Sequence, residues 1–224
     1  MIITIDGPAA AGKGTISSFL SQKYKLAYFD TGMVYRAVGL QMVLSDFDIN
    51  NKVQALQTAE NMTFPQMMKL SQHPNFRSEI GSNAASVVSA YPEVRQALLA
   101  MQKNFALNPV YADGSPADGV VYDGRDTGTV ICPQADLKLF VTASTEVRAK
   151  RRYDEYIAKG ISATYEKVLQ DMIARDERDS KRSAAPMKPA DDAVIIDTSD
   201  LNIEAVLAII TPLVDSLYAK SIGA

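Results

Sequence analysis

The sequence is poor in the residue types that build disulfides, soft-metal centres and histidine relays. It contains one cysteine, Cys132, one histidine, His73, and no tryptophan. A single cysteine excludes an internal disulfide and a Cys₄-type metal site. A histidine-based catalytic relay would have to use His73, and the His-Pro-Asn context of that residue is typical of an exposed turn.

Long apolar runs and an excess of positive charge are missing too. No window approaches the roughly 18 consecutive apolar residues of a transmembrane helix, and the N-terminus carries no basic leader. We therefore expect a cytoplasmic protein without a membrane partner. The net charge of −3 argues against a nucleic-acid partner. Any phosphate binding must then come from a local pocket.

The remaining composition is that of an ordinary globular protein. The 224 residues are 47% apolar and 22% charged, which is enough material for a sizeable core. The length predicts a single domain, with sub-lobes at most.

Residues 2–15 (I-I-T-I-D-G-P-A-A-A-G-K-G-T) predict a phosphate-binding loop. A short β-branched run precedes the glycines and an amphipathic segment follows them, which is the strand–turn–helix context that such a loop requires. Backbone N–H groups and the helix dipole would then face one anion, with a lysine ammonium beside them. The alternative is an ordinary glycine-rich turn with an exposed lysine. The expected phosphate-binding residues are Gly7, Pro8, Ala9, Ala10, Ala11, Gly12, Lys13, Gly14 and Thr15.

Strands and helices alternate along the chain. Strands are expected at 2–5, 26–29, 119–122, 137–142 and 193–197, and helices at 33–44, 92–105, 145–158 and 164–181. A closing helix begins near residue 203, and Pro212 should kink or restart it. This alternation predicts an α/β fold with a five-stranded parallel sheet. Residues 108–119 read as a loop.

Residues 46–90 are harder to interpret. Residues 53–62 are weakly helical, 63–76 show no clear period, and 78–88 are helix-like with small residues. An irregular block between two strands of a parallel sheet indicates an appended substrate lobe.

Three groups of charged residues are candidates for ligand binding. Arg125 and Asp126 follow a strand directly, and ligands of open α/β sheets bind at the carboxyl ends of strands. The alternative is a plain surface turn. Arg36, next to Tyr35 at the start of a helix, fits an anion site and an exposed helix position equally well.

The third group lies on the two helices after residue 144. Arg148, Arg151 and Arg152 are neighbours on one helix surface, and Arg175, Arg178, Asp179 and Arg182 form one stripe on the next helix. A solvated salt-bridge face is the alternative for both sets.

Three classes of protein use a phosphate loop in this way: small-molecule kinases, switch GTPases and ATP-driven motors. A GTPase needs an N-K-x-D motif, whereas the only Asn-Lys pair is followed by Val53-Gln54. A motor needs a long apolar strand that ends in paired acids, and none is evident. The inserted lobe and the many arginines favour a kinase.

Five motifs resemble those of bacterial cytidylate kinases. They are G-P-A-A-A-G-K-G-T, D-T-G-M-V-Y-R, N-A-A-S with Y-P-E-V-R, D-G-R-D-T-G-T and R-D-E-R-D-S-K-R, in family order and spacing along nearly the whole chain. The resemblance implies a single nucleoside monophosphate kinase domain. Its core would be about 1–45, 106–145 and 183–224, its NMP-binding lobe about 46–105 and its lid about 146–182. It also implies a monomer that transfers phosphate from ATP to CMP or dCMP with Mg²⁺.

The resemblance further implies roles for individual residues. Lys13, Arg125, Arg148, Arg152 and Arg182 would be catalytic, with Arg151 also in the lid, and the Thr15 hydroxyl would sit near the metal. The substrate residues would be Thr31, Arg36 and Arg125 for the acceptor phosphate, Ser86, Arg95 and Asp126 for cytosine, Arg175 and Asp179 for the ribose, Arg182 near the phosphates, and Tyr35.

The chain departs from the family pattern at a few positions. Ala9-Ala10 replaces a Ser-Gly-like pair, and Thr31 replaces the more common serine but keeps the hydroxyl. The 108–119 loop is longer than in many members, and the 58–80 block is shorter or irregular. The last two departures concern the outline of the substrate lobe.

Overall fold

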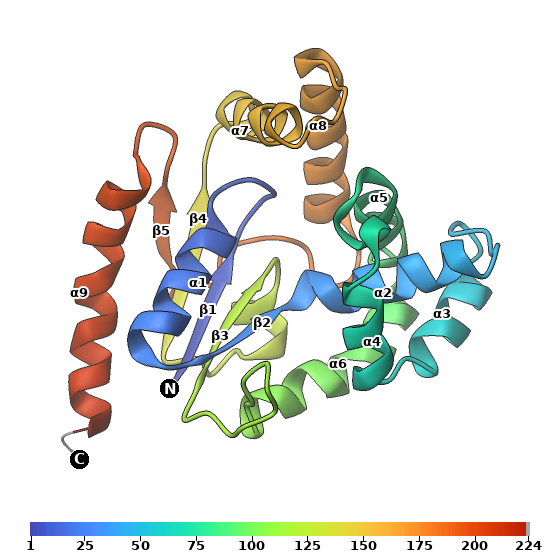
Figure 1. The fold of residues 1–224 in the computed structure, drawn as a ribbon. Coiled ribbons are helices and arrows are strands. Elements are labelled where there is room, and N and C mark those ends of the chain that lie inside the picture. The colour runs from blue at the N-terminus through green and yellow to red at the C-terminus, as the bar shows by residue number, and fades with distance from the viewer. Residues whose placement is uncertain (223–224) are drawn as a thin grey trace.

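The computed structural model describes residues 1–222, and its centre is a five-stranded parallel sheet (Figure 1). The strand order is β2-β3-β1-β4-β5. The strands are β1 (Ile2–Asp6), β2 (Ala27–Asp30), β3 (Val120–Gly124), β4 (Leu137–Thr142) and β5 (Val194–Asp197). The predicted fold class and all five strands are confirmed.

The register of the sheet brings the sequence motifs together. Asp6 pairs with Gly124, and Asp30 with Asp123. The residues that end β1, β2 and β3 therefore share one edge. The phosphate loop and the D-G-R-D segment start from that edge, so the pairing alone makes them neighbours.

Helices α1 (Lys13–Tyr24) and α9 (Ile203–Ile222) cover one face of the sheet (Figure 1). Alternate strand residues such as Ile3, Ile5 and Val121 point to this face and are fully buried. Pro212 lies inside α9, and the helix continues through it without the restart that we expected.

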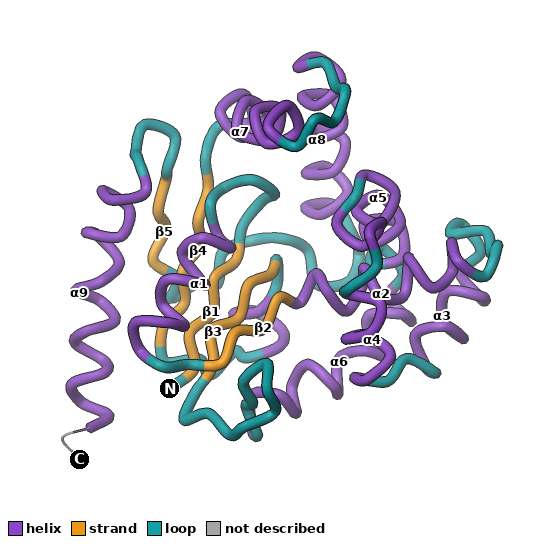
Figure 2. The backbone as a smooth tube through the Cα atoms, in the orientation of Figure 1, coloured by secondary structure: helices purple, strands orange, loops and turns teal. Residues whose placement is uncertain are grey.

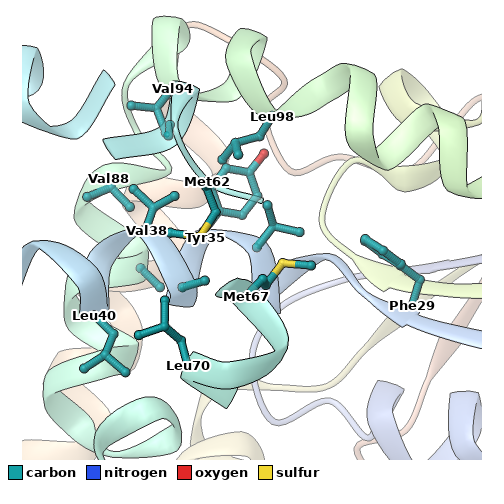
Figure 3. Close-up of a cluster of buried hydrophobic side chains, with 14 of the residues drawn as sticks. Phe29, Tyr35, Val38, Leu40, Met62, Met67, Leu70, Val88, Val94 and Leu98 are labelled. Carbon is teal, nitrogen blue, oxygen red and sulfur yellow. The ribbon is translucent and has the colours of Figure 1, made fainter. Parts of the chain in front are cut away.

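The other face carries a helical block: α2 (Thr31–Leu44), α3 (Lys52–Glu60), α4 (Phe64–Ser71), the 3₁₀ turn η1 (Pro74–Arg77), α5 (Glu79–Val88) and α6 (Pro92–Leu107). Its core gathers Tyr35 and Val38 of α2 with Met67 of α4 and Leu98 of α6 (Figure 3). The irregular stretch is thus mostly helical. Thr63 and Gln66 form a capping box that starts α4.

His73 is not the exposed turn residue that its context predicted. The side chain is half-buried, and its Nδ1 accepts a hydrogen bond from the Asn75 N–H at 3.1 Å. It caps the start of η1. This structural role explains the histidine without any catalytic use.

Helices α7 (Thr145–Ala158) and α8 (Tyr165–Lys181) form a hairpin beyond the carboxyl edge of the sheet (Figures 1 and 2). A small apolar cluster of Ala9, Ala149, Val168 and Met172 joins them to the phosphate loop. A segment without helix or strand, 182–193, returns the chain to β5 (Figure 2). Residues 223 and 224, part of the expected core segment 183–224, lie outside the described residues.

Residues 108–119 form a loop, as expected, with one isolated bridge between Val110 and Pro116. Within residues 1–222, no helix has the combined length and apolar character needed to cross a bilayer.

Gly39 offers a test of the packing between α2 and α5. A Cβ atom at Gly39 would lie 2.8 Å from the Ala84 carbonyl carbon and 2.9 Å from the Ala85 nitrogen. Helix propensity favours alanine, but overpacking against backbone opposes it, so we expect Gly39→Ala to lower the free energy of unfolding by about 1–2 kcal/mol. Urea unfolding measures this, with Gln41→Ala on the same helix as control. A Gly39→Ala variant as stable as the parent would contradict the packing.

Candidate active site

The phosphate loop joins β1 to α1 through three residues with positive φ. Gly7 has φ 141° and Gly12 has φ 96°. A Cβ at Gly7 would lie 1.9 Å from the Val141 carbonyl oxygen, so only glycine fits there. Ala10 has φ 60° although it is not glycine. The strained residue is one of the two that depart from the family pattern.

Lys13 lies beneath this loop and is buried. Its Nζ donates to the Pro8 carbonyl at 2.8 Å and lies 3.8 Å from Asp123 Oδ1. Burial lowers the pKa of Lys13 to about 7, Arg125 acts in the same direction, and Asp123 opposes them. An anion at the loop would favour the charged ammonium.

A cavity of about 320 Å³ opens between the phosphate loop, the edge of the sheet and α8. It brings together most of the residues predicted from the sequence. Those that line it are Ala9, Ala10, Gly12, Lys13, Gly14, Thr15, Thr31, Tyr35, Arg36, Ser86, Arg95, Arg125, Asp126, Arg152, Arg175, Asp179 and Arg182. Gly7, Pro8, Ala11 and Arg148 do not line it.

Guanidinium–carboxylate pairs fill the end of this cavity near α6 and α8. Arg95 forms a buried ion pair with Asp126, whose other oxygen lies 3.2 Å from Arg182 Nη2. The Tyr35 ring centre lies 5.1 Å from the Arg95 guanidinium carbon. Arg178 Nε donates to Ser86 Oγ at 3.2 Å, which links α8 to α5. In this conformation, then, protein groups occupy the polar atoms expected to read a base.

Arg125 and Asp179 form a second pair, at 3.0 Å between Nε and Oδ2. Burial alone would raise the pKa of Asp179, but the surrounding guanidinium groups, Arg125 first, hold it below its usual value. The carboxylate is therefore ionised across the neutral pH range.

Two arginines at the cavity are incompletely partnered. Within the described part of the chain, the buried Nε atoms of Arg36 and Arg175 have no hydrogen-bond partner. Arg36 Nη1 lies 3.5 Å from Asp30 Oδ2, and Arg175 Nε lies 3.9 Å from Asp179 Oδ2. Burial and then Arg125 lower the pKa of Arg175 to about 9. Crowded, buried cations of this kind favour an anion between them.

The three arginines of α7 do not act as one group. Arg148 is buried, pairs with Asp176 at 2.7 Å and donates to the Ala143 and Ala9 carbonyls. Arg151 donates to the carbonyl and hydroxyl of Thr198. Arg152 pairs with Glu155 and alone lines the cavity. Adjacent Cα positions thus lead to three separate environments because these side chains are long.

The structure also places residues at the site that the sequence reasoning missed. Asp30, Asp123, Arg77 and Glu155 line the cavity. The two aspartates lie at or next to the carboxyl ends of β2 and β3, which was a usable signal. Arg77 and Glu155 had no such signal.

A second cavity of about 270 Å³ lies on the other side of the loop and the start of α1. Arg151 and Thr198 border it, together with the start of α9. Its lining residues are Ala11, Gly12, Thr15, Ile16, Arg151, Thr198, Leu201, Asn202, Ile203 and Val206.

A phosphate loop at the carboxyl edge of a parallel sheet, facing a cavity lined by arginines and carboxylates, defines a P-loop phosphotransferase with a small anionic acceptor. A family model described as cytidylate kinase matches residues 3–216. The chain belongs to the cytidylate kinase family, whose members are nucleoside monophosphate kinases that use ATP.

Full-length relatives agree with this assignment. A cytidylate kinase of Rhodopseudomonas palustris is 44% identical over 219 residues, covering 98% of both chains. One of Xanthobacter autotrophicus is 46% identical over 219 residues, covering 98% of this chain and 99% of the relative. A solved structure of an uncharacterized protein from Eubacterium ventriosum, at 12% identity and TM-score 0.52, covers 96% of this chain and 98% of its own. That likeness concerns the fold alone.

Proposed function

We propose that the chain transfers the γ-phosphate of ATP to CMP or dCMP in the 320 Å³ cavity, giving ADP and the diphosphate. One observation carries the proposal: the phosphate-loop lysine and the D-G-R-D segment border the same space, with Lys13 Nζ 3.8 Å from Asp123. Donor and acceptor phosphates would meet there. A coupled ADP-release assay with ATP and CMP, dCMP, UMP, AMP or GMP tests it. Absence of CDP formation would refute it.

The acceptor phosphate would be held by Thr31, Arg36 and Arg125. The unpartnered Arg36 Nε and the nearby Arg125 supply donors to a dianion. Thr31 Oγ donates to the Asp123 carbonyl at 3.0 Å, and this hydroxyl would turn to a phosphate oxygen. The second pKa of a phosphate monoester is about 6, so the nucleophilic oxygen is already ionised and no general base is needed.

The cytosine would be read by Ser86, Arg95 and Asp126. Asp126 can accept from the exocyclic amine, and Arg95 can donate to the ring N3 and O2. Tyr35 beside Arg95 adds an aromatic wall. Arg182 pairs with Asp126, which supports a role in orienting that carboxylate. Contact of Arg182 with the phosphates, as expected from the sequence, would require this ion pair to open.

The ribose would be bound by Asp179 and Arg175 on α8. Asp179 is ionised and half-engaged by Arg125, so an oxygen remains for a sugar hydroxyl. Arg175 lies next to it and has a free Nε. Sugar and phosphate binding would then share one stripe of α8.

The donor would occupy the phosphate loop, with its base in the second cavity. Lys13 would neutralise the β- and γ-phosphates, while the loop amides bind their oxygens. The Arg151 guanidinium and the Thr198 loop border a space of about 270 Å³ that suits a planar base. Arg148, tied to the Ala9 carbonyl, would keep α7 attached to the loop.

The residues present also fit Mg²⁺. The Thr15 hydroxyl lies at the loop and lines the cavity, and residues 1–222 hold no group of three or more His, Cys, Asp or Glu that would form a closed protein cage. Mg²⁺ usually keeps water and phosphate ligands with few protein ones. When bound, it would neutralise charge on the β- and γ-oxygens.

Catalysis by this arrangement is positioning and charge neutralisation. We propose that the α7–α8 hairpin is the lid and α3–α6 the acceptor lobe, and that closure excludes water. We further propose that the protein acts as a cytoplasmic monomer, which light scattering of the purified chain would test.

The first prediction concerns the acceptor arginines. Arg125→Ala or Arg36→Ala should lower kcat/KM for CMP by about 10²-fold or more, on the order of 3 kcal/mol, because a buried cation facing the phosphate is lost. Steady-state kinetics measures this. Lys150→Ala, at an exposed pair on α7, should leave the rate within about twofold. Near-normal turnover of both arginine variants would remove the acceptor-site assignment.

The second prediction concerns the base. Uracil has an acceptor where cytosine has its amine, so it would face the Asp126 carboxylate. An unpaired buried polar group costs about 1–3 kcal/mol, so kcat/KM for UMP should be about 10- to 100-fold below that for CMP. Asp126→Asn can donate to uracil and should narrow the ratio. Equal use of UMP and CMP by the parent protein would refute the assignment.

The third prediction follows from the Lys13 pKa of about 7 in the empty site. Bound phosphates favour the charged ammonium, so the pKa rises on ATP binding and a proton is taken up. ATP affinity should fall by up to about tenfold per pH unit above pH 7 and change little below pH 6. Calorimetry at pH 8 in buffers of different ionisation enthalpy should detect close to one proton. Lys13→Arg, which does not titrate, should lose the uptake; uptake in that variant would contradict the assignment.

A further inference from the structure

Asp6, the last residue of β1, is buried directly before the phosphate loop. Its carboxylate accepts three hydrogen bonds from one element. Thr127 N and Thr127 Oγ1 donate to Oδ1 at 2.9 Å each, and Gly128 N donates to Oδ2 at 2.8 Å. One side chain thus ties the strand that leads into the phosphate loop to the segment after β3.

That segment is a π-helical turn, η2 (Thr127–Ile131), which begins immediately after Arg125 and Asp126. The amides at the start of a helical turn have no partner within it. The Thr127 and Gly128 amides find theirs in Asp6, while the Asp126 carbonyl accepts from Val130 N at 2.9 Å. The start of η2, and with it the direction in which Arg125 and Asp126 leave the strand, is fixed by Asp6.

The junction before η2 has little room to adjust. A Cβ at Gly124 would lie 2.4 Å from Thr127 Cγ2 and 2.6 Å from Thr31 Oγ1. Gly124 itself pairs with Asp6 across the sheet. The position of η2 is therefore transmitted to Arg125 and Asp126 without slack.

We propose that Asp6 is a positioning residue for phosphoryl transfer, holding the Arg125–Asp126 segment in place relative to the phosphate loop. The proposal rests on the acceptor-site roles given above. Phosphoryl transfer requires reacting atoms about 3–3.5 Å apart, and a misplacement of about 1 Å can lower the rate by about 10²-fold. A link between the donor loop and the acceptor segment acts on that distance.

The chemistry of the residue supports a dedicated role. Only an acceptor without protons satisfies all three donors, and an asparagine would turn an N–H₂ toward the Gly128 amide. Burial raises the pKa of Asp6 to about 6, while the Gly128 and Thr127 hydrogen bonds lower it. None of the ion pairs within residues 1–222 includes Asp6. A buried carboxylate without a counter-ion costs stability, yet it occupies this position.

The test compares kinetics for the two substrates. Asp6→Asn should lower kcat/KM for CMP by about 10- to 100-fold and leave KM for ATP within about threefold. Thr127→Val removes one donor and should change the same quantities in the same direction by about three- to tenfold, while Thr127→Ser should restore them. If Asp6→Asn does not fold, the Thr127 pair decides. Hydrogen exchange of the Thr127 and Gly128 amides should accelerate in Asp6→Asn.

Asp136→Asn is the matched control. Asp136 Oδ2 accepts from the Ile2 amide at 2.7 Å, at the opposite end of the same strand, so its loss should leave kcat and both KM values unchanged. Asp6 and Thr127 variants with lowered melting temperature but parental kinetics for CMP would overturn the proposal. So would equal losses for ATP and CMP. Parental activity of Arg125→Ala would instead overturn the acceptor-site assignment itself.

Discussion

The parallel pairing of β1 with β3 is the constraint on which the site depends. It sets Asp6 opposite Gly124, so the loop that begins at Gly7 and the segment that continues with Arg125 leave the sheet side by side. β2 adds Asp30 to the same edge through its pairing with β3. Helices on both faces bury this three-strand unit, and the apolar residues of β1 and β3 are fully buried. The functional groups sit on the part of the molecule that moves least.

Electrostatic balance is the second organising feature. The cavity collects lysine and arginine side chains that would repel one another if left alone, and carboxylates on separate elements offset them. Asp126 balances Arg95 and Arg182, and Asp179 balances Arg125. The depressed pKa values of Lys13 and Arg175 mark where the balance is incomplete. Those are the positions at which phosphate groups would be most favourable, because each added negative charge relieves a desolvated cation.

The sequence predicted most of the frame because its signals were local. The strand 137–142 and the helix 145–158 are found with the expected bounds, the helix after a Ser144 cap. Helix α4 escaped prediction because it has only eight residues, two of them buried, so no period could develop. Its signal was the Thr63–Gln66 cap. The π-turn η2 was missed too, since its geometry depends on Asp6, far away in sequence.

The site was predictable as a set of residues but not as a network. A strand end followed by G-R-D indicated function for Arg125 and Asp126, and the cavity includes both. Their partners were not deducible, because Asp179 and Arg182 reach them from α8, more than 50 positions away. The arginines of α7 show the same limit. Helical spacing made them neighbours, and tertiary contacts then sent Arg148 to Asp176 and Arg151 to Thr198.

Helix α8 explains how substrate binding and lid position can be coupled. One stripe of this helix contacts three other elements: Asp179 pairs with Arg125 after β3, Arg178 donates to Ser86 on α5, and Asp176 pairs with Arg148 on α7. A nucleotide that displaces the first two contacts would replace protein partners with its own oxygens and ring atoms. The contact with α7 would remain, so the hairpin would follow the nucleotide. Binding and closure then become one rearrangement of polar partners, driven by the difference between protein and substrate contacts.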